Sequence, residues 1–219
     1  VTVNALPTAT ISTGGATTFC AGGSVILTSS TGASYLWSTG ATTQSITVTT
    51  AGSYSVTVTN ASGCSTTSAA TNVIVNALPT ATITAGGVTT FCAGGSVTLT
   101  SSAGAGYLWS NGATTQSIIA TTSGSYSVTV TNASGCFATS AATAVTVNAL
   151  PTATITAGST TTFCAGGSVI LTSSNGASYL WSTGATIQSI TVTTAGSYSV
   201  TVTNANGCSA TSAATAVTV

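Results

Sequence analysis

The 219-residue sequence contains no Lys, Arg, Asp, Glu or His. General acid–base catalysis needs a side chain that titrates near the working pH, and that side chain is normally one of the missing types. Ser and Thr are abundant, but a hydroxyl is a weak nucleophile without a neighbouring base. The composition therefore predicts that the chain is not an enzyme.

The same absences exclude several classes of ligand. Calcium and magnesium sites need carboxylates, and a zinc site here would have to consist entirely of cysteine. Nucleic-acid binding depends on cationic side chains that neutralise phosphates. We therefore predict no cofactor, no metal and no nucleic-acid partner. No run of residues approaches the length of an apolar membrane span, so no membrane span is predicted.

What the sequence does contain is one unit repeated three times. Pro7, Pro79 and Pro151 are spaced by 72 residues, and Trp37, Trp109 and Trp181 follow the same period. Units 4–75 and 76–147 differ at 14 of 72 positions without a gap. The predicted domains are repeat 1 (4–75), repeat 2 (76–147) and repeat 3 (148–219), with 1–3 as the end of a preceding repeat's last strand.

Each unit has the pattern of a small β-sandwich. Apolar and hydroxyl residues alternate over Tyr54–Thr59, as in a half-buried strand, and Gly, Asn and Ser occur about every ten residues. The fold class predicted is all-β: three tandem Ig-like sandwiches forming an elongated rod. The expected strands of repeat 1 are A near Thr8–Ser12, B Ser24–Ser30, C Ser34–Ser38, a D/E pair across Thr42–Val48, F Tyr54–Thr59 and G Ser65–Val75.

Two features of the immunoglobulin core recur in every unit. In that fold a Trp on strand C packs against a B–F disulfide, and a Tyr lies two residues before the second Cys. Here the Trp and the Tyr are present, and aliphatic residues replace both cysteines. The predicted core consists of Leu27, Trp37, Tyr54 and Val56, then Leu99, Trp109, Tyr126 and Val128, and finally Leu171, Trp181, Tyr198 and Val200.

Four segments of the unit carry a family resemblance: Phe19–Val25, Tyr35–Ile46, Gly52–Asn60 and Gly63-Cys64. Over all three units the chain resembles the tandem Ig-like and PKD-like repeats of very large secreted or cell-surface proteins of the Bacteroidota. The resemblance implies an adhesin stalk or an extracellular fibre on a bacterial cell surface. Such repeats usually carry acidic residues in the turn before the second Cys. The turn here, Asn60–Gly63, has none.

The six cysteines lack metal-ligand spacing, which favours disulfides and an oxidising, extracellular location over free buried thiols. On the strand map, Cys20 and Cys64 lie at opposite ends of a sandwich, about 20 Å apart, too far for a disulfide. The short linker 76–79 would instead bring adjacent repeats together, which favours the pairs Cys20–Cys136 and Cys92–Cys208. Cys64 and Cys164 would then serve repeats beyond these. The in-repeat alternative pairs Cys20–Cys64, Cys92–Cys136 and Cys164–Cys208.

The leading functional hypothesis is a structural repeat that associates with itself through uncharged Thr/Ser surfaces and is stiffened by disulfides. Net charge keeps protein molecules apart, and lysines on edge strands block edge-to-edge pairing; this chain has neither. The alternatives are a carbohydrate-binding module that uses Phe19, Tyr35 or Tyr54, and an ice-binding surface of Thr-x-Thr rows such as Thr57–Thr59.

Overall fold

The computed structural model describes residues 2–219, and every regular element in that range is a β-strand. No helix there is long and apolar enough to cross a membrane. The chain forms two compact units. The first comprises the residues up to Thr82 together with Ser101–Gln116 and Val128–Ala141. The second comprises Ile83–Thr100, Ser117–Ser127 and Ala142–Val219.

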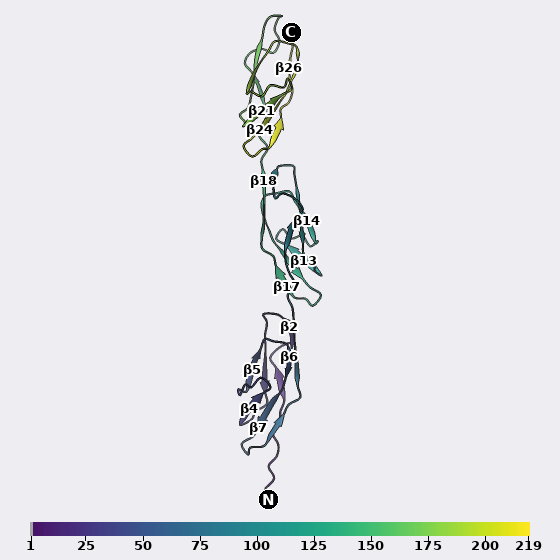
Figure 1. Cartoon of the computed structure of the whole chain (residues 1–219), viewed down its shortest axis with the longest axis vertical. Coiled ribbons are helices and arrows are strands. Elements are labelled where there is room, and N and C mark those ends of the chain that lie inside the picture. The colour runs from purple at the N-terminus through teal and green to yellow at the C-terminus, as the bar shows by residue number, and fades with distance from the viewer. Residues whose placement is uncertain (1) are drawn as a thin grey trace. The chain divides into compact units, whose positions relative to one another are not determined.

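The strands recur with the 72-residue period of the sequence (Figure 1). Repeat 1 contains β1 (Ile11–Thr13), β2 (Thr18–Cys20), β3 (Val25–Ser29), β4 (Ser34–Trp37), β5 (Ser45–Val48), β6 (Gly52–Tyr54), β7 (Val56–Thr59), β8 (Ser65–Thr67) and β9 (Thr71–Asn76). Repeat 2 contains β10 (Ile83–Ala85), β11 (Thr90–Cys92), β12 (Val97–Ser101), β13 (Gly106–Trp109), β14 (Ser117–Ala120), β15 (Gly124–Tyr126), β16 (Val128–Thr131), β17 (Phe137–Thr139) and β18 (Thr143–Asn148). Repeat 3 contains β19 (Ile155–Ala157), β20 (Val169–Ser173), β21 (Ser178–Trp181), β22 (Ser189–Val192), β23 (Gly196–Tyr198), β24 (Val200–Thr203), β25 (Ser209–Thr211) and β26 (Thr215–Val217).

The strand order is that of an Ig-like sandwich. In repeat 1 the sheets run β1-β3-β5, β4-β7-β8 and β2-β9-β6. All neighbours are antiparallel except β2 and β9, which pair in parallel. The hydroxyl of Tyr54 donates to the Thr50 carbonyl oxygen at 2.9 Å, and Tyr126 and Tyr198 make the same bond. This is the tyrosine corner of the immunoglobulin fold, so the all-β, Ig-like fold class is confirmed.

The core of each repeat forms because alternate residues of a strand point to the same face. Along β3 the side chains of Val25, Leu27 and Ser29 are buried and those between them are not. The indole nitrogen of Trp37, which is 2% exposed, donates to the Thr43 carbonyl oxygen at 2.8 Å, so the buried ring keeps its hydrogen bond. None of the twelve residues expected in the core is more than 8% exposed.

Strands F and G are each interrupted, whereas the sequence pattern predicts them continuous. The expected F strand breaks at Ser55 into β6 and β7, and the expected G strand breaks at 68–70 into β8 and β9. At the break the Ser68 hydroxyl accepts the Val56 N–H at 3.1 Å, and Ser68 N–H donates to the Val56 carbonyl at 2.9 Å. A side-chain hydroxyl thus replaces one backbone acceptor of the ladder. Ser140 and Ser212 do the same in repeats 2 and 3.

Two other strand predictions need correction. Strand A begins later than expected, at Ile11, and is followed by a second short strand, β2, which pairs with β9. The expected D/E pair is a single strand, β5, because Thr42 has no regular structure and Thr43 and Gln44 form bends. Thr2 and Val3 lie outside any strand and Val1 lies outside the described residues, so the assignment of 1–3 to the end of a preceding repeat's last strand stays a prediction.

Candidate functional site: cysteine junctions and uncharged faces

Each compact unit contains one disulfide. Cys20–Cys136 lies in the first unit and Cys92–Cys208 in the second, each with a Cα–Cα distance of 5.6 Å and a sequence separation of 116 residues. Each bridge therefore joins one repeat of the sequence to the next. The in-repeat alternative is not formed. Cys64 is half-buried and free, and Cys164 is exposed and free.

The first junction is built from the end of β9 and the residues that follow it. In the parallel pairing of β2 with β9, Cys20 lies opposite Asn76, and the Ala21 N–H donates to the Asn76 carbonyl oxygen at 2.8 Å. This pairing fixes the backbone of Cys20 against the linker. The sulfur of Cys136 lies 3.9 Å from the same carbonyl oxygen.

The side chain of Asn132 forms hydrogen bonds to the same linker and to the bridging cysteine. Its side-chain nitrogen donates to the Ala77 carbonyl oxygen at 2.8 Å, while its side-chain oxygen accepts the Cys136 N–H at 3.0 Å. One amide therefore holds both the linker and the cysteine that forms the bridge. Sequence reasoning missed this role of Asn132. The available signal was the recurrence of Asn60, Asn132 and Asn204 four residues before a cysteine.

The second junction repeats the first one bond by bond. The Ala93 N–H donates to the Asn148 carbonyl oxygen at 2.8 Å. Asn204 donates to the Ala149 carbonyl oxygen at 2.9 Å and accepts the Cys208 N–H at 3.0 Å. Cys136 and Cys208 are both fully buried. The linker is thus held by two hydrogen bonds and one disulfide in each unit.

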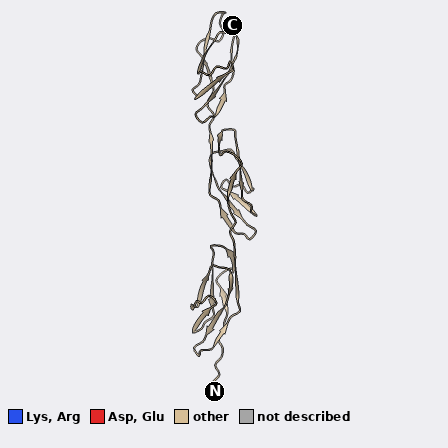
Figure 2. Cartoon of the chain, in the orientation of Figure 1, with Lys and Arg blue, Asp and Glu red and all other residues tan. Residues whose placement is uncertain are grey.

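The surface carries no charged side chain, so Figure 2 shows neither blue nor red residues. Many outward hydroxyls are hydrogen-bonded to one another. On the outer face of β4-β7-β8, Thr57 pairs with Thr67 at 2.8 Å and Thr59 with Ser65 at 2.9 Å. Hydroxyls that satisfy one another lose fewer bonds to water when a second surface covers them.

An exposed leucine recurs among these hydroxyls. Leu36 lies opposite Thr57 in the register of β4 and β7, and it is 55% exposed. Leu108 and Leu180 have nearly the same exposure, 56% and 55%. We call the side chains of Leu36, Thr57 and Thr67, with their counterparts in the other repeats, the Leu/Thr face. Sequence reasoning missed it because the run Tyr35–Trp37 reads as uniformly apolar.

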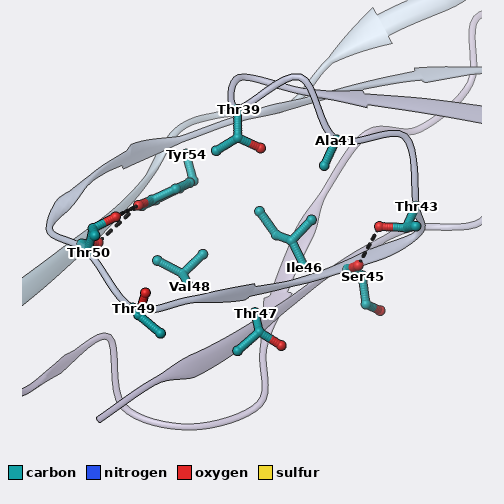
Figure 3. A pocket seen from close by; sticks show the side chains of 10 residues that line it. All are labelled: Thr39, Ala41, Thr43, Ser45, Ile46, Thr47, Val48, Thr49, Thr50 and Tyr54. Carbon is teal, nitrogen blue, oxygen red and sulfur yellow. Dashed lines mark hydrogen bonds between the residues drawn. The ribbon is translucent and has the colours of Figure 1, made fainter. Parts of the chain in front are cut away.

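A shallow depression of about 410 Å³ lies along β5 in repeat 1 (Figure 3). Ile46 and Val48 point into it from the strand, Tyr54 lies at one end, and Thr39 and Ala41 face them from the preceding turn. A similar depression of about 310 Å³ occurs in repeat 3. β5 is an edge strand of its sheet, so the depression follows an unpaired strand edge.

The aromatic residues expected to stack on sugars are used by the fold. Tyr54 is 7% exposed, and Phe19 and Tyr35 are partly buried against the core. The Tyr35 hydroxyl donates to the Gly32 carbonyl at 3.2 Å. Within residues 2–219, no group of three or more His, Cys, Asp or Glu side chains is placed to hold a metal ion.

No known protein family matches the chain, and no curated protein matches it. Several solved structures are similar to it. A 1.5-MDa bacterial ice-binding adhesin is 20% identical over 99% of both chains, with a TM-score of 0.33. An ectodomain fragment of ICAM-5 is 12% identical over 97% of this chain and 76% of that one, with a TM-score of 0.48. Fibronectin(III)-like modules of Clostridium thermocellum CbhA are 14% identical over 65% of this chain and 95% of theirs, with a TM-score of 0.31. At these values the likenesses carry no argument about function.

Proposed function

We propose that the chain is a structural segment of an extracellular filament or of a bacterial adhesin stalk, and not an enzyme. In this proposal the repeats form a stiff, elongated rod. The observation that carries it is the junction: each linker is held by a backbone bond, an Asn side chain and a disulfide. A disulfide across a long loop stabilises by about 2–4 kcal/mol and restricts hinge motion.

The second part of the proposal is lateral self-association through the Leu/Thr faces. Nothing on these faces repels a second copy, because the chain has no charged side chain. Leu36, Leu108 and Leu180 supply apolar area, at about 25 cal/mol per Å² buried. The paired hydroxyls around them limit the cost of removing water. The two disulfides suit an oxidising, extracellular location.

Light scattering tests the lateral part in a variant with Cys64→Ser and Cys164→Ser, in which no free thiol remains. We expect its apparent mass to rise reversibly with concentration. Adding Leu36→Glu, Leu108→Glu and Leu180→Glu should abolish the rise, because each repeat then carries a charge in the contact.

The matched control places the same three charges elsewhere. The exposed loop substitutions Thr31→Glu, Ala103→Glu and Asn175→Glu give the same net charge but leave the Leu/Thr faces intact. We expect this variant to associate more strongly than the one with altered faces. A chain that stays monomeric at high concentration, or equal loss in both variants, would refute the lateral contact.

The alternative functions are carbohydrate and ice binding. The depression along β5 offers hydroxyls over an apolar floor, but it has neither an exposed aromatic ring nor a carboxylate. A glycan array and a thermal-hysteresis measurement would detect these two activities. A positive result in either would replace the structural proposal.

A further inference from the structure

Cys64 lies in the same local structure as the two cysteines that form bridges from this loop. Its N–H donates to the Asn60 side-chain oxygen at 3.0 Å, and Asn60 donates to the Ala5 carbonyl oxygen at 2.8 Å. Its sulfur lies 3.9 Å from the Asn4 carbonyl oxygen. The sulfurs of Cys136 and Cys208 lie at the same distance from Asn76 and Asn148. The loop is therefore arranged for a bridge that is not made within the chain.

Cys164 corresponds to Cys20, the other cysteine of the first formed disulfide. Its segment, Phe163–Gly167, is identical in sequence to Phe19–Gly23, and the Gly167 N–H donates to the Cys164 carbonyl at 2.9 Å, as Gly23 does to Cys20. At Cys20 the parallel pairing extends to Asn76. In repeat 3 the bridge between Thr162 and Thr218 corresponds to the pairing of Thr18 with Ile74, and Cys164 is exposed.

The two formed disulfides show which cysteines pair with each other. In both, a cysteine of the Cys20 type is joined to a cysteine of the Cys136 type from the following repeat. Cys164 and Cys64 are the remaining members of the two types. We infer that Cys164 of one copy of the chain and Cys64 of a second copy form a disulfide that joins repeat 3 of the first to repeat 1 of the second.

The residues around Cys64 complete this site. In the first junction the Asn76 carbonyl oxygen accepts the Ala21 N–H and lies beside the Cys136 sulfur. Asn4 of the second copy occupies the equivalent position beside Cys64 and would accept the Ala165 N–H. Val3 is 90% exposed, so it packs against little of its own chain.

Such a contact is heterologous, because two different surfaces meet, and it therefore propagates copies into a filament or closes them into a ring. The inference rests on the structural role proposed above, because it names the partner as a second copy of this chain. It does not depend on the Leu/Thr faces.

The reaction needs an oxidant that is itself a disulfide, such as oxidised glutathione. The thiolate of one cysteine attacks the oxidant, forms a mixed disulfide and releases one glutathione thiol. The second thiolate attacks the cysteine sulfur of that mixed disulfide and releases the second glutathione thiol. Two cysteine thiols lose two protons and two electrons in total, and the oxidant takes them up.

Two single variants test the inference without disturbing the formed bridges. Cys164→Ser leaves only Cys64 free, and Cys64→Ser leaves only Cys164 free. After incubation in a glutathione redox buffer, on a denaturing gel without reductant that removes non-covalent contacts, we expect each variant alone to run mainly as the monomer and the equal mixture to form a disulfide-linked heterodimer. The unmodified chain should form a series of multimers in steps of 20.8 kDa that returns to monomer on reduction.

The heterodimer should exceed either homodimer by about tenfold, the ratio that about 1.4 kcal/mol of preference gives. Random thiol pairing would give only about twofold, and that result would overturn the inference, as would an unmodified chain that remains monomeric. Lateral association is measured separately, in the variant with no free thiol. If lateral association is not observed, a specific Cys164–Cys64 disulfide remains supported. If that disulfide does not form, lateral association through the Leu/Thr faces is not affected.

Discussion

Two buried serines in each repeat allow a sharp test of the hydrogen-bonding scheme at the interrupted strands. Ser68, 9% exposed, accepts the Val56 N–H at 3.1 Å, and the equivalent bonds to Ser140 and Ser212 are 3.1 and 3.2 Å. Changing Ser68, Ser140 and Ser212 together to Ala leaves one buried N–H unpaired in every repeat. An unpaired buried donor costs about 1–3 kcal/mol.

The matched control is the set Ser29, Ser101 and Ser173. Each is 3% exposed, and no hydroxyl of this set has a hydrogen-bond partner within residues 2–219. Changing these three to Ala removes a buried polar atom that bonds to nothing. We therefore expect the control to be neutral or to gain about 1 kcal/mol per repeat.

Thermal unfolding followed by circular dichroism measures both triple variants. For a domain of this size, 1 kcal/mol moves the midpoint by about 4–8 °C. The Ser68-type variant should therefore unfold about 10 °C lower than the unmodified chain, and the Ser29-type variant at the same temperature or a few degrees higher. Equal losses in both sets would refute the reasoning, because the two differ mainly in whether the hydroxyl is paired.

Three further predictions follow from the same structure. A Cβ on Gly32 would lie 2.4 Å from Val58 Cγ1, whereas one on Gly15 would meet nothing within 4 Å. Gly32→Ala should lower the free energy of unfolding by about 1–3 kcal/mol, and Gly15→Ala should leave it unchanged or raise it by about 0.5 kcal/mol, both measured by guanidinium titration. Tyr54→Phe removes the bond to the Thr50 carbonyl oxygen and should cost about 1 kcal/mol in the same titration. The unfolding midpoint should change by less than about 1 °C between about pH 5 and about pH 7, because no side chain present normally titrates there, and by as little between about 0.05 M and about 0.5 M NaCl. A clear dependence on pH or salt would mean that binding of protons or ions differs between the folded and unfolded chain.

The central strands could be predicted from the sequence because local patterns define them. Strands B and C, expected at Ser24–Ser30 and Ser34–Ser38, are β3 and β4 to within one residue at each end. Period-two alternation and the flanking glycines mark such strands directly. The repeated Trp marks the core for the same reason, since its large apolar area has to be buried.

What the sequence could not show depends on contacts between distant residues. The pairing of β2 with β9 joins Thr18 to Ile74 and has no local signature. The break in strand G arises because the Ser68 hydroxyl bonds to Val56, twelve residues away, and alternation alone cannot distinguish this serine from any other. The hydrogen bond from the Asn132 side chain could not be predicted for the same reason, since its acceptor is the Ala77 carbonyl oxygen across the linker.

The most direct test of the central claim, that each repeat is covalently bound to the next, is a disulfide map. The chain has no trypsin site, so the unreduced protein is cut with chymotrypsin at its aromatic residues and analysed by mass spectrometry. We expect linked peptides containing Cys20 with Cys136 and Cys92 with Cys208. A peptide that links Cys20 to Cys64 would contradict it.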